Sequence, residues 1–272
     1  MYLFREISIG LLVAFRSGVM QGYIWFTLFL LTSVFLAAEF SGRQPATQAL
    51  DVGLSVIRLG LPLLIIFTIQ ELVGREFERR IYLTSLSYPR ARGQWLLSRF
   101  ITCFLLMGLL IILLGGGLAM IVQWVSTGYQ QDTPPDLGLP YLITLGLLGL
   151  DMLVILAIAT LLSVMASSSF LVILGTIGFT LIARSYMYII QLLQDSGYLV
   201  EKIADPQLYK GSLSLLAFLL PDLGSLDVRM ISLYGKMSFL PENIWFLIAT
   251  SLTYSMALIA LAVWRLNRRE FN

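Results

Sequence analysis

Long apolar runs recur along this chain, and they limit what it can fold into. The longest covers residues 95–125 and contains one charged side chain, Arg99. A helix of about 20 apolar residues crosses the hydrocarbon core of a bilayer. Only 12% of the 272 residues are charged, whereas a soluble domain carries roughly 25%. With a mean hydropathy of +0.85, the chain is predicted to be an integral membrane protein with a single transmembrane domain, residues 1–272.

Six apolar runs predict an all-α, polytopic fold with six transmembrane helices. We expect these helices at residues 22–38, 52–73, 95–125, 139–165, 168–192 and 244–266. Only Ala166 and Ser167 separate the fourth helix from the fifth, so no domain fits between them. The glycines at 115–117 favour either close packing or a bend in the third helix.

The first residues of the chain have an amphipathic pattern. Helical spacing places Phe4, Ile7, Leu11, Leu12 and Phe15 on one face, with the charged residues elsewhere. This pattern is typical of a helix that lies along the membrane surface. We therefore expect an interfacial helix over residues 1–17. A cleaved signal peptide is disfavoured because the apolar run that follows is too long and starts too late.

The distribution of cationic residues predicts the orientation of the chain. Lysine and arginine gather in the cytoplasmic loops of membrane proteins. Of the 18 lysines and arginines, eleven fall on one side of the predicted spans: Arg5, Arg16, Arg75, Arg79, Arg80, Arg90, Arg92, Arg99, Arg265, Arg268 and Arg269. The short loops on the other side contain only Arg43. Both termini are thus expected in the cytoplasm, which also requires an even number of spans.

One connection is long enough to form structure of its own. Residues 193–242 are expected outside the cytoplasm and mix charges with apolar patches. The apolar run Leu213–Leu220 is too short to cross a membrane and is followed by Pro221, which ends helices. This connection is therefore predicted to contain short interfacial helices.

The most cationic part of the chain lies between the second and third predicted spans. Residues 73–99 contain six arginines and two glutamates. Such charges are too costly to place in lipid, so residues 74–94 are predicted to form a cytoplasmic segment. One interpretation is a basic loop on anionic lipid. The interleaved glutamates favour the other interpretation, a docking surface for a soluble protein.

Several kinds of chemistry lack their residues in this sequence. The chain has no histidine, one cysteine (Cys103) and no GxxxxGK[ST] phosphate-binding loop. We expect no catalytic residue, no bound metal or cofactor, and no nucleic-acid partner. An intramembrane enzyme is disfavoured because no plausible set of nucleophile, base and metal ligand is present.

The charged segment resembles the coupling helix of type-2 ATP-binding-cassette exporter permeases. Within that family it is most similar to the branch that includes the permease for nitrous-oxide-reductase maturation. Its members tend to have acidic residues, then Gly-Thr, an apolar stretch, a proline, an arginine and a lysine. The matching residues here are Glu76, Glu78, Pro89 and Arg92, with Arg99 where the lysine is common. Arg80-Ile81 replaces Gly-Thr, which is a departure from the pattern.

The resemblance extends to the amphipathic start, to LLPDLGSLDVRMISLYG at residues 219–235, and to the ending WRLNRREFN. It implies a multi-pass permease of the bacterial inner membrane that couples ATP hydrolysis to export, or to force on periplasmic partners. The implied partners are two copies of a cytoplasmic ATPase that binds ATP and Mg, and a second permease subunit, either identical or a paralogue. A periplasmic partner would dock on residues 193–242.

The resemblance also implies which residues touch the ATPase. Charged residues would make charge-assisted contacts, apolar ones would anchor them, and the proline would turn the chain back. These predicted coupling residues are Glu76, Glu78, Arg79, Arg80, Tyr82, Leu83, Leu86, Tyr88, Pro89 and Arg92.

Three charged residues fall inside predicted spans. Asp151 lies near the middle of the fourth span, where a carboxylate is costly and marks either a buried pair or a functional site. Arg58 in the second span is its expected partner. Arg184 lies toward the outer end of the fifth span, where snorkelling would also explain it. The alternative function is therefore an ATP-independent secondary transporter or channel that uses Asp151, Arg58 and Arg184.

Aromatic residues also fall near span ends that we expect at the outer surface. They are Tyr23, Trp25, Tyr141, Tyr186, Tyr188 and Trp245. An interfacial aromatic belt is the favoured interpretation, and stacking on a substrate is the alternative.

Overall fold

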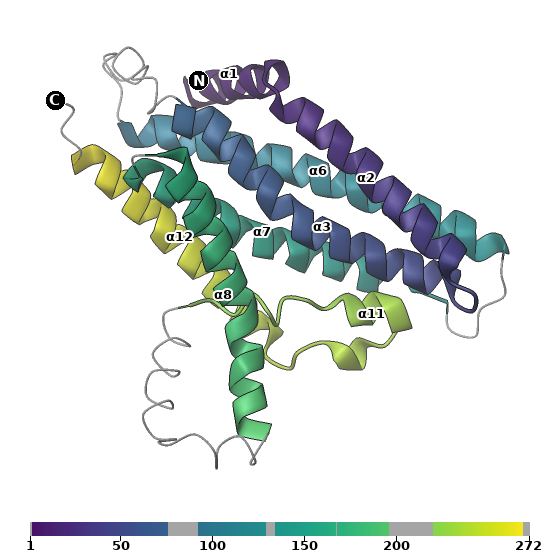
Figure 1. Cartoon of the computed structure of the whole chain (residues 1–272). Coiled ribbons are helices and arrows are strands. Elements are labelled where there is room, and N and C mark those ends of the chain that lie inside the picture. The colour runs from purple at the N-terminus through teal and green to yellow at the C-terminus, as the bar shows by residue number, and fades with distance from the viewer. Residues whose placement is uncertain (1, 76–91, 129–133, 167, 196–219, 269–272) are drawn as a thin grey trace.

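The computed structural model describes residues 2–75, 92–128, 134–166, 168–195 and 220–268. All regular structure in these ranges is helical (Figure 1). The helices are α1 (Tyr2–Arg16), α2 (Val19–Phe40), α3 (Pro45–Ile69), η1 (Gln70–Gly74), α6 (Arg92–Gly128), α7 (Leu139–Met165), α8 (Ser169–Asp195), α11 (Arg229–Tyr234), η2 (Met237–Phe239) and α12 (Ile244–Arg268).

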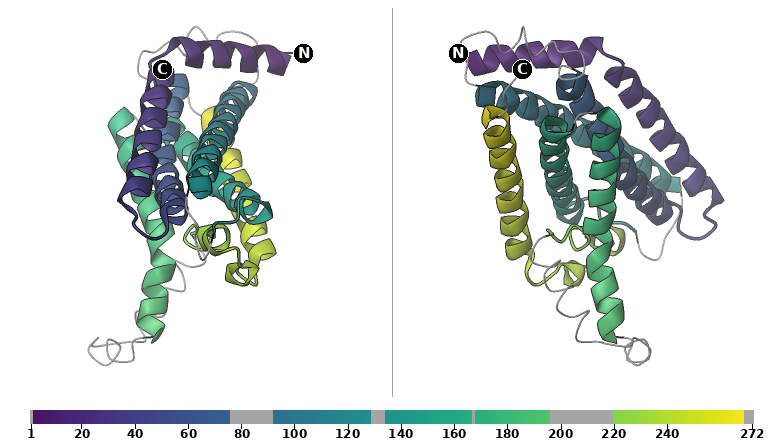
Figure 2. Two further views of the ribbon diagram at one scale, coloured as in Figure 1. Left: turned by 90° about the vertical axis from the view of Figure 1, so that its right-hand side faces the viewer. Right: turned by 60° about the vertical axis from the view of Figure 1, so that its left-hand side comes forward.

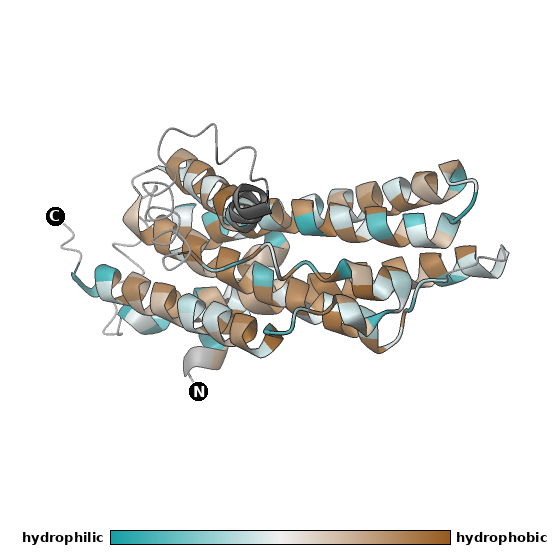
Figure 3. Cartoon of the chain, turned by 90° about the horizontal axis from the view of Figure 1, so that it is seen from below, coloured by the Kyte–Doolittle hydropathy of each residue, from teal (hydrophilic) through white to brown (hydrophobic). Residues whose placement is uncertain are grey.

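Six of these helices are long and apolar enough to cross a membrane: α2, α3 continued by η1, α6, α7, α8 and α12. The predicted all-α fold with six such helices is therefore confirmed. Hydrophobic residues run along the helices, and hydrophilic ones gather at several of their ends (Figure 3). The largest boundary difference is α3, which begins at Pro45 rather than residue 52. Proline at a helix start costs no hydrogen bond and presets φ.

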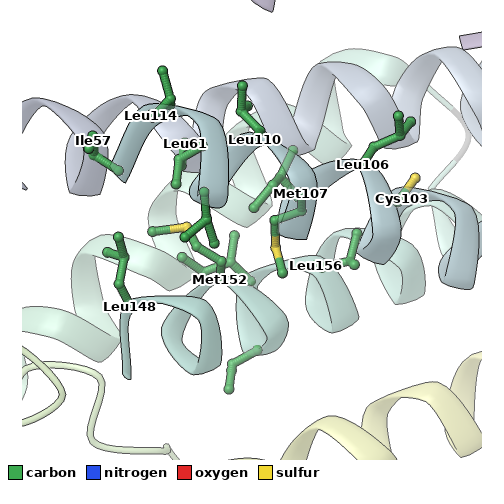
Figure 4. Close-up of a cluster of buried hydrophobic side chains, with 14 of the residues drawn as sticks. Ile57, Leu61, Cys103, Leu106, Met107, Leu110, Leu114, Leu148, Met152 and Leu156 are labelled. Atoms are coloured by element: carbon green, nitrogen blue, oxygen red, sulfur yellow. The ribbon is translucent and has the colours of Figure 1, made fainter. Parts of the chain in front are cut away.

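The core of the bundle lies between α3, α6 and α7, which are more buried than α2, α8 and α12. Buried side chains from the three central helices meet there, with Leu61, Met107 and Met152 among them (Figure 4). Cys103 is buried in the same core. The core is continuous, so the three central helices form one packed unit.

The glycines at 115–117 lie within the single helix α6. A Cβ on Gly115 would lie 2.7 Å from Leu145 Cδ1 of α7. Tyr141 of α7 also donates its hydroxyl to the Gly115 carbonyl at 2.7 Å. Gly115 therefore allows α6 and α7 to approach closely. Of the two roles predicted for these glycines, this is close packing rather than a bend.

Helix α1 lies across one end of the bundle (Figure 2). It packs on α6, and a Cβ on Gly10 would lie 2.7 Å from Thr102 Oγ1. Ile7 is buried, whereas Phe4, Leu12 and Phe15 are exposed. The apolar face predicted from the sequence is thus divided between protein and surroundings. We call this end of the bundle the α1 end; α12 also finishes there (Figures 1 and 2). The opposite end is called the α11 end.

The described part of the long connection, residues 220–243, does not simply lie on a surface as predicted. Its first part folds back against α3 and α8 and buries Leu223, Leu226 and Val228. The short helix α11 follows beside α3 and α7 (Figure 1). Residues 196–219, which hold most of the predicted helix Leu213–Leu220, lie outside the described residues.

Candidate functional site

Asp151 is the starting point of the candidate site. It lies next to the middle of α7, about 18 Å along the helix axis from Leu139 at 1.5 Å per residue. Its side chain is almost completely buried, with a relative exposure of 1%. A buried carboxylate needs a charged or hydrogen-bonding partner to offset its lost hydration.

Two arginines from neighbouring helices supply that partner. Arg184 of α8 donates from Nη2 to Asp151 Oδ2 at 2.7 Å. Arg58 of α3 places Nε 3.6 Å from the same oxygen. The expected Arg58–Asp151 pair is therefore present. Snorkelling of Arg184 is wrong, because its guanidinium turns inward to the carboxylate. The three charges connect α3, α7 and α8.

Arg184 also satisfies a backbone group that a proline leaves free. Pro62 lies inside α3 and has no N–H to give to the carbonyl four residues earlier. That carbonyl belongs to Arg58, and Arg184 Nη1 donates to it at 3.1 Å. An unpaired buried carbonyl costs about 1–3 kcal/mol. The guanidinium of Arg184 thus binds the Asp151 carboxylate of α7 and also replaces the backbone hydrogen bond that Pro62 removes from α3.

Arg58 continues the network toward the α11 end. Its guanidinium forms an ion pair with Asp227, through Nη1 and Oδ2. Its Nη2 donates to the Leu223 carbonyl at 2.9 Å. The Leu223 N–H in turn donates to the Ala183 carbonyl of α8 at 3.3 Å. Arg58 therefore ties residues 223–227 to the helices that hold Asp151.

Arg229 completes the network at the start of α11. It lies 3.1 Å from Asp51 Oδ1 and 3.5 Å from Asp227 Oδ2, and it donates to Ser55 Oγ. The network then contains three aspartates and three arginines and has no formal net charge. A neutral network suits a low-dielectric bundle, since an isolated charge there would be costly. Its members are Asp51, Arg58, Asp151, Arg184, Asp227 and Arg229.

Sequence reasoning missed Asp51, Asp227 and Arg229. One signal was available: Asp51, Ser55 and Arg58 are spaced i, i+4 and i+7 along α3 and so share a helix face. No comparable signal joins this face to residues 227–229, which lie far away in the chain. Only the folding back of residues 220–235 brings them together.

A small cavity borders the network. Its volume is about 20 Å³, and its lining includes Arg58, Thr144, Asp151 and Asp227. About 10–15 Å³ measured this way is room for one water molecule. The carboxyl atom Oδ1 of Asp151 has no hydrogen-bond partner among the described residues. The charged groups of the site thus pair mainly with one another, and the cavity beside them has room for about one water molecule.

Most of the predicted coupling residues lie outside the described residues: Glu76, Glu78, Arg79, Arg80, Tyr82, Leu83, Leu86, Tyr88 and Pro89. Arg92 is described, and it begins α6 at the α1 end. On the other side of this gap, Arg75 pairs with Glu71 at 2.5 Å. The segment is thus flanked by η1 and α6, and α6 packs against both α3 and η1.

The turn before this segment has unusual geometry. Gln70–Gly74 form a π-helix, a form often found at functional sites. The Gln70 amide is buried, and neither its nitrogen nor its oxygen has a hydrogen-bond partner in the described part of the chain. A Cβ on Gly74 would lie 2.0 Å from Gln70 Oε1. No pattern in the sequence indicates this turn.

The predicted aromatic belt is wrong for three of its tyrosines. Tyr23, Tyr141 and Tyr186 are buried. Tyr23 shares a 2.7 Å hydrogen bond with Thr68 of α3, toward the α1 end rather than the expected outer end. Tyr186 donates to the Leu220 carbonyl at 3.1 Å. Trp25 and Trp245 are exposed, but Trp25 lies near the start of α2, so only Trp245 fits a belt at the expected outer end. The tyrosines serve helix packing because each hydroxyl finds an internal partner.

Neither a family model nor a curated protein matches this sequence. Within the described residues, no group of three or more acidic or cysteine side chains is placed to hold a metal ion. The features that indicate a function are therefore the fold, the ion-pair network and the sequence of residues 74–94.

Proposed function

We propose that this protein is the transmembrane permease subunit of an ATP-binding-cassette transporter. ATP would be hydrolysed by two copies of a separate cytoplasmic ATPase that binds ATP and Mg. The observation that carries the proposal is the charged segment of residues 74–94, which joins two central helices that pack against each other. Force applied there would reach α3 and α6 together, because both belong to the continuous core.

Three further observations support the proposal. Six helices have membrane-spanning length. Helix α1 packs across α6, as expected of an elbow helix at a membrane surface. Arginines gather at the α1 end, among them Arg5, Arg75, Arg92 and Arg268, which favours the cytoplasm for that end. The implied location is the inner membrane of a bacterium.

The proposed assembly contains a second permease subunit, either a copy of this chain or a paralogue. Its work would be export, or force transmission to a periplasmic partner on residues 193–242. A purified single chain is expected to hydrolyse no ATP, and the same chain isolated from its native membrane is expected to bring an ATPase with it. Sustained ATP hydrolysis by the single chain would contradict the proposal.

A secondary transporter or channel is the second candidate. The observation that favours it is the meeting of Asp151, Arg58 and Arg184 at the centre of the bundle. These charges pair with one another, however, and the adjoining cavity of about 20 Å³ has no room for a solute larger than water. A charge relay needs groups that exchange partners with the substrate. The network is therefore better explained as a structural link between helices.

A further inference from the structure

Beyond the ion-pair network, residues 229–246 expose a run of large apolar side chains. Met230, Tyr234, Met237 and Phe239 are exposed by 41–47%. The rings of Tyr234 and Phe239 lie 6.1 Å apart. Trp245 and Phe246, at the start of α12, are exposed by 80% and 69%. We call these six residues the aromatic rim.

The opposite side of α11 is fixed to the bundle. Ile231, Ser232 and Leu233 are buried. The Asp136 N–H donates to the Ser232 carbonyl at 2.8 Å, and Thr144 Oγ1 lies 3.5 Å from Ser232 Oγ. The exposed side is therefore held in one orientation by contacts on the buried side.

These contacts also fix the depth of the rim. Asp136 lies three residues before α7 begins at Leu139, and Phe239 lies five residues before α12 begins at Ile244. Both α7 and α12 have membrane-spanning length. The segment between them thus lies level with two helix ends, which is where the boundary of the hydrocarbon region falls.

We propose that the aromatic rim lies in the headgroup region of the membrane leaflet at the α11 end, with phospholipid as its partner. Tyrosine and tryptophan prefer this region because one part of each ring system is apolar and another is polar. Lys236 is exposed within the rim and is available to phosphate groups. Two members of the rim, Trp245 and Phe246, lie on the membrane-length helix α12, which favours lipid over a soluble protein. This placement does not depend on the proposed ATPase partner.

The experiment measures where the rim lies relative to lipid and water. In a Cys103→Ala background, Phe239→Cys carries a bimane fluorophore in vesicles of phosphatidylethanolamine and phosphatidylglycerol. Gly42→Cys is the matched control, because Gly42 lies in the α2–α3 loop at the same end and a Cβ added there would have no neighbour within 4 Å. Quenchers are aqueous iodide and lipids with a doxyl group either near the headgroup or near the acyl terminus. Gel filtration and retained ellipticity check that each variant folds.

The label on residue 239 is expected to lose most fluorescence to the doxyl group near the headgroup. The label on residue 42 should lose more to iodide. Equal iodide quenching at both positions would overturn the proposal, since the rim would then face water or a protein partner. Strongest quenching by the doxyl group near the acyl terminus would also overturn it, since the rim would lie inside the hydrocarbon. Met230→Cys provides a second label on the same surface if Phe239→Cys does not fold.

Discussion

At the scale of single residues, the network depends on Asp151, whose carboxylate faces two guanidinium groups inside the bundle. Asp151→Leu would leave both arginines without that anion. Removing one member of a buried ion pair typically costs about 3–5 kcal/mol. We expect a loss of this size in the free energy of unfolding, measured by denaturant titration in detergent micelles.

Asp222→Asn is the matched control for Asp151→Leu, because Asp222 accepts local hydrogen bonds from Ser225. That change should lower the free energy of unfolding by less than about 1 kcal/mol, as is usual for partly exposed sites. Equal losses for the two variants would show that the intramembrane pair contributes no special stability.

Arg184 and Pro62 allow a sharper test of one hydrogen bond. Pro62→Ala restores an N–H for the Arg58 carbonyl, so the bond from Arg184 to that carbonyl is no longer needed. A double-mutant cycle of Pro62→Ala with Arg184→Met should therefore give a coupling of about 1 kcal/mol, the usual net value of a hydrogen bond. If the two losses in the free energy of unfolding simply added, Arg184 would not replace the hydrogen bond that Pro62 removes.

Only some residues of the site can be predicted from the sequence. Asp151 and Arg58 could be paired from the sequence because each is a rare charge within an apolar run. The role of Arg184 could not, since the free carbonyl beside Pro62 indicates that some donor is needed but not which one. Asp227 and Arg229 resemble ordinary loop charges in the sequence. Only the folding back of residues 220–235 brings Asp227 to Arg58, and Arg229 to Asp227 and Asp51.

At the scale of helices, α3 and α6 approach closely where Gly53 meets Leu118. A Cβ on Gly53 would lie 2.3 Å from Leu118 Cδ1, and Leu118 is fully buried. Gly53→Ala should therefore cost about 1–3 kcal/mol of stability through overpacking. Thermal unfolding in detergent measures the effect, and Leu118→Val in the same chain should recover part of it.

Gly116→Ala is the matched control on α6, because a Cβ at this position would have no neighbour within 4 Å. That change should be neutral or stabilising, since alanine favours helix by about 1 kcal/mol over glycine. A Gly53→Ala variant as stable as Gly116→Ala would show that the two helices are not as close as described.

Helix positions were the most predictable feature, because each long apolar run became one helix. The π-helix of Gln70–Gly74 was not predictable, since it depends on an extra residue within a turn rather than on any residue type. The fold of residues 220–235 was also missed. Its leucines look like an interfacial pattern, and their burial depends on space left between α3, α7 and α8.

At the scale of the whole molecule, the six proposed spans predict that α1 and the end of α12 lie on the same side of the membrane. Cys103 is buried, so the unmodified chain should react little with a membrane-impermeant maleimide. Gly42→Cys should label in intact cells, whereas Asn267→Cys, exposed near the end of α12, should label only after permeabilisation. Labelling of both in intact cells would contradict the orientation inferred from the arginines.

We propose that residues 74–94 receive force from a separate ATPase. The most direct measurement is the amount of ATPase that co-purifies with a tagged chain carrying Glu78→Lys, compared with the unmodified chain. Arg43→Glu, a charge reversal in the short loop at the opposite end, is the control. We predict that Glu78→Lys abolishes ATPase recovery while Arg43→Glu leaves it unchanged. Full recovery with Glu78→Lys, from a chain that still folds and reaches the membrane, would show that residues 74–94 do not bind the ATPase.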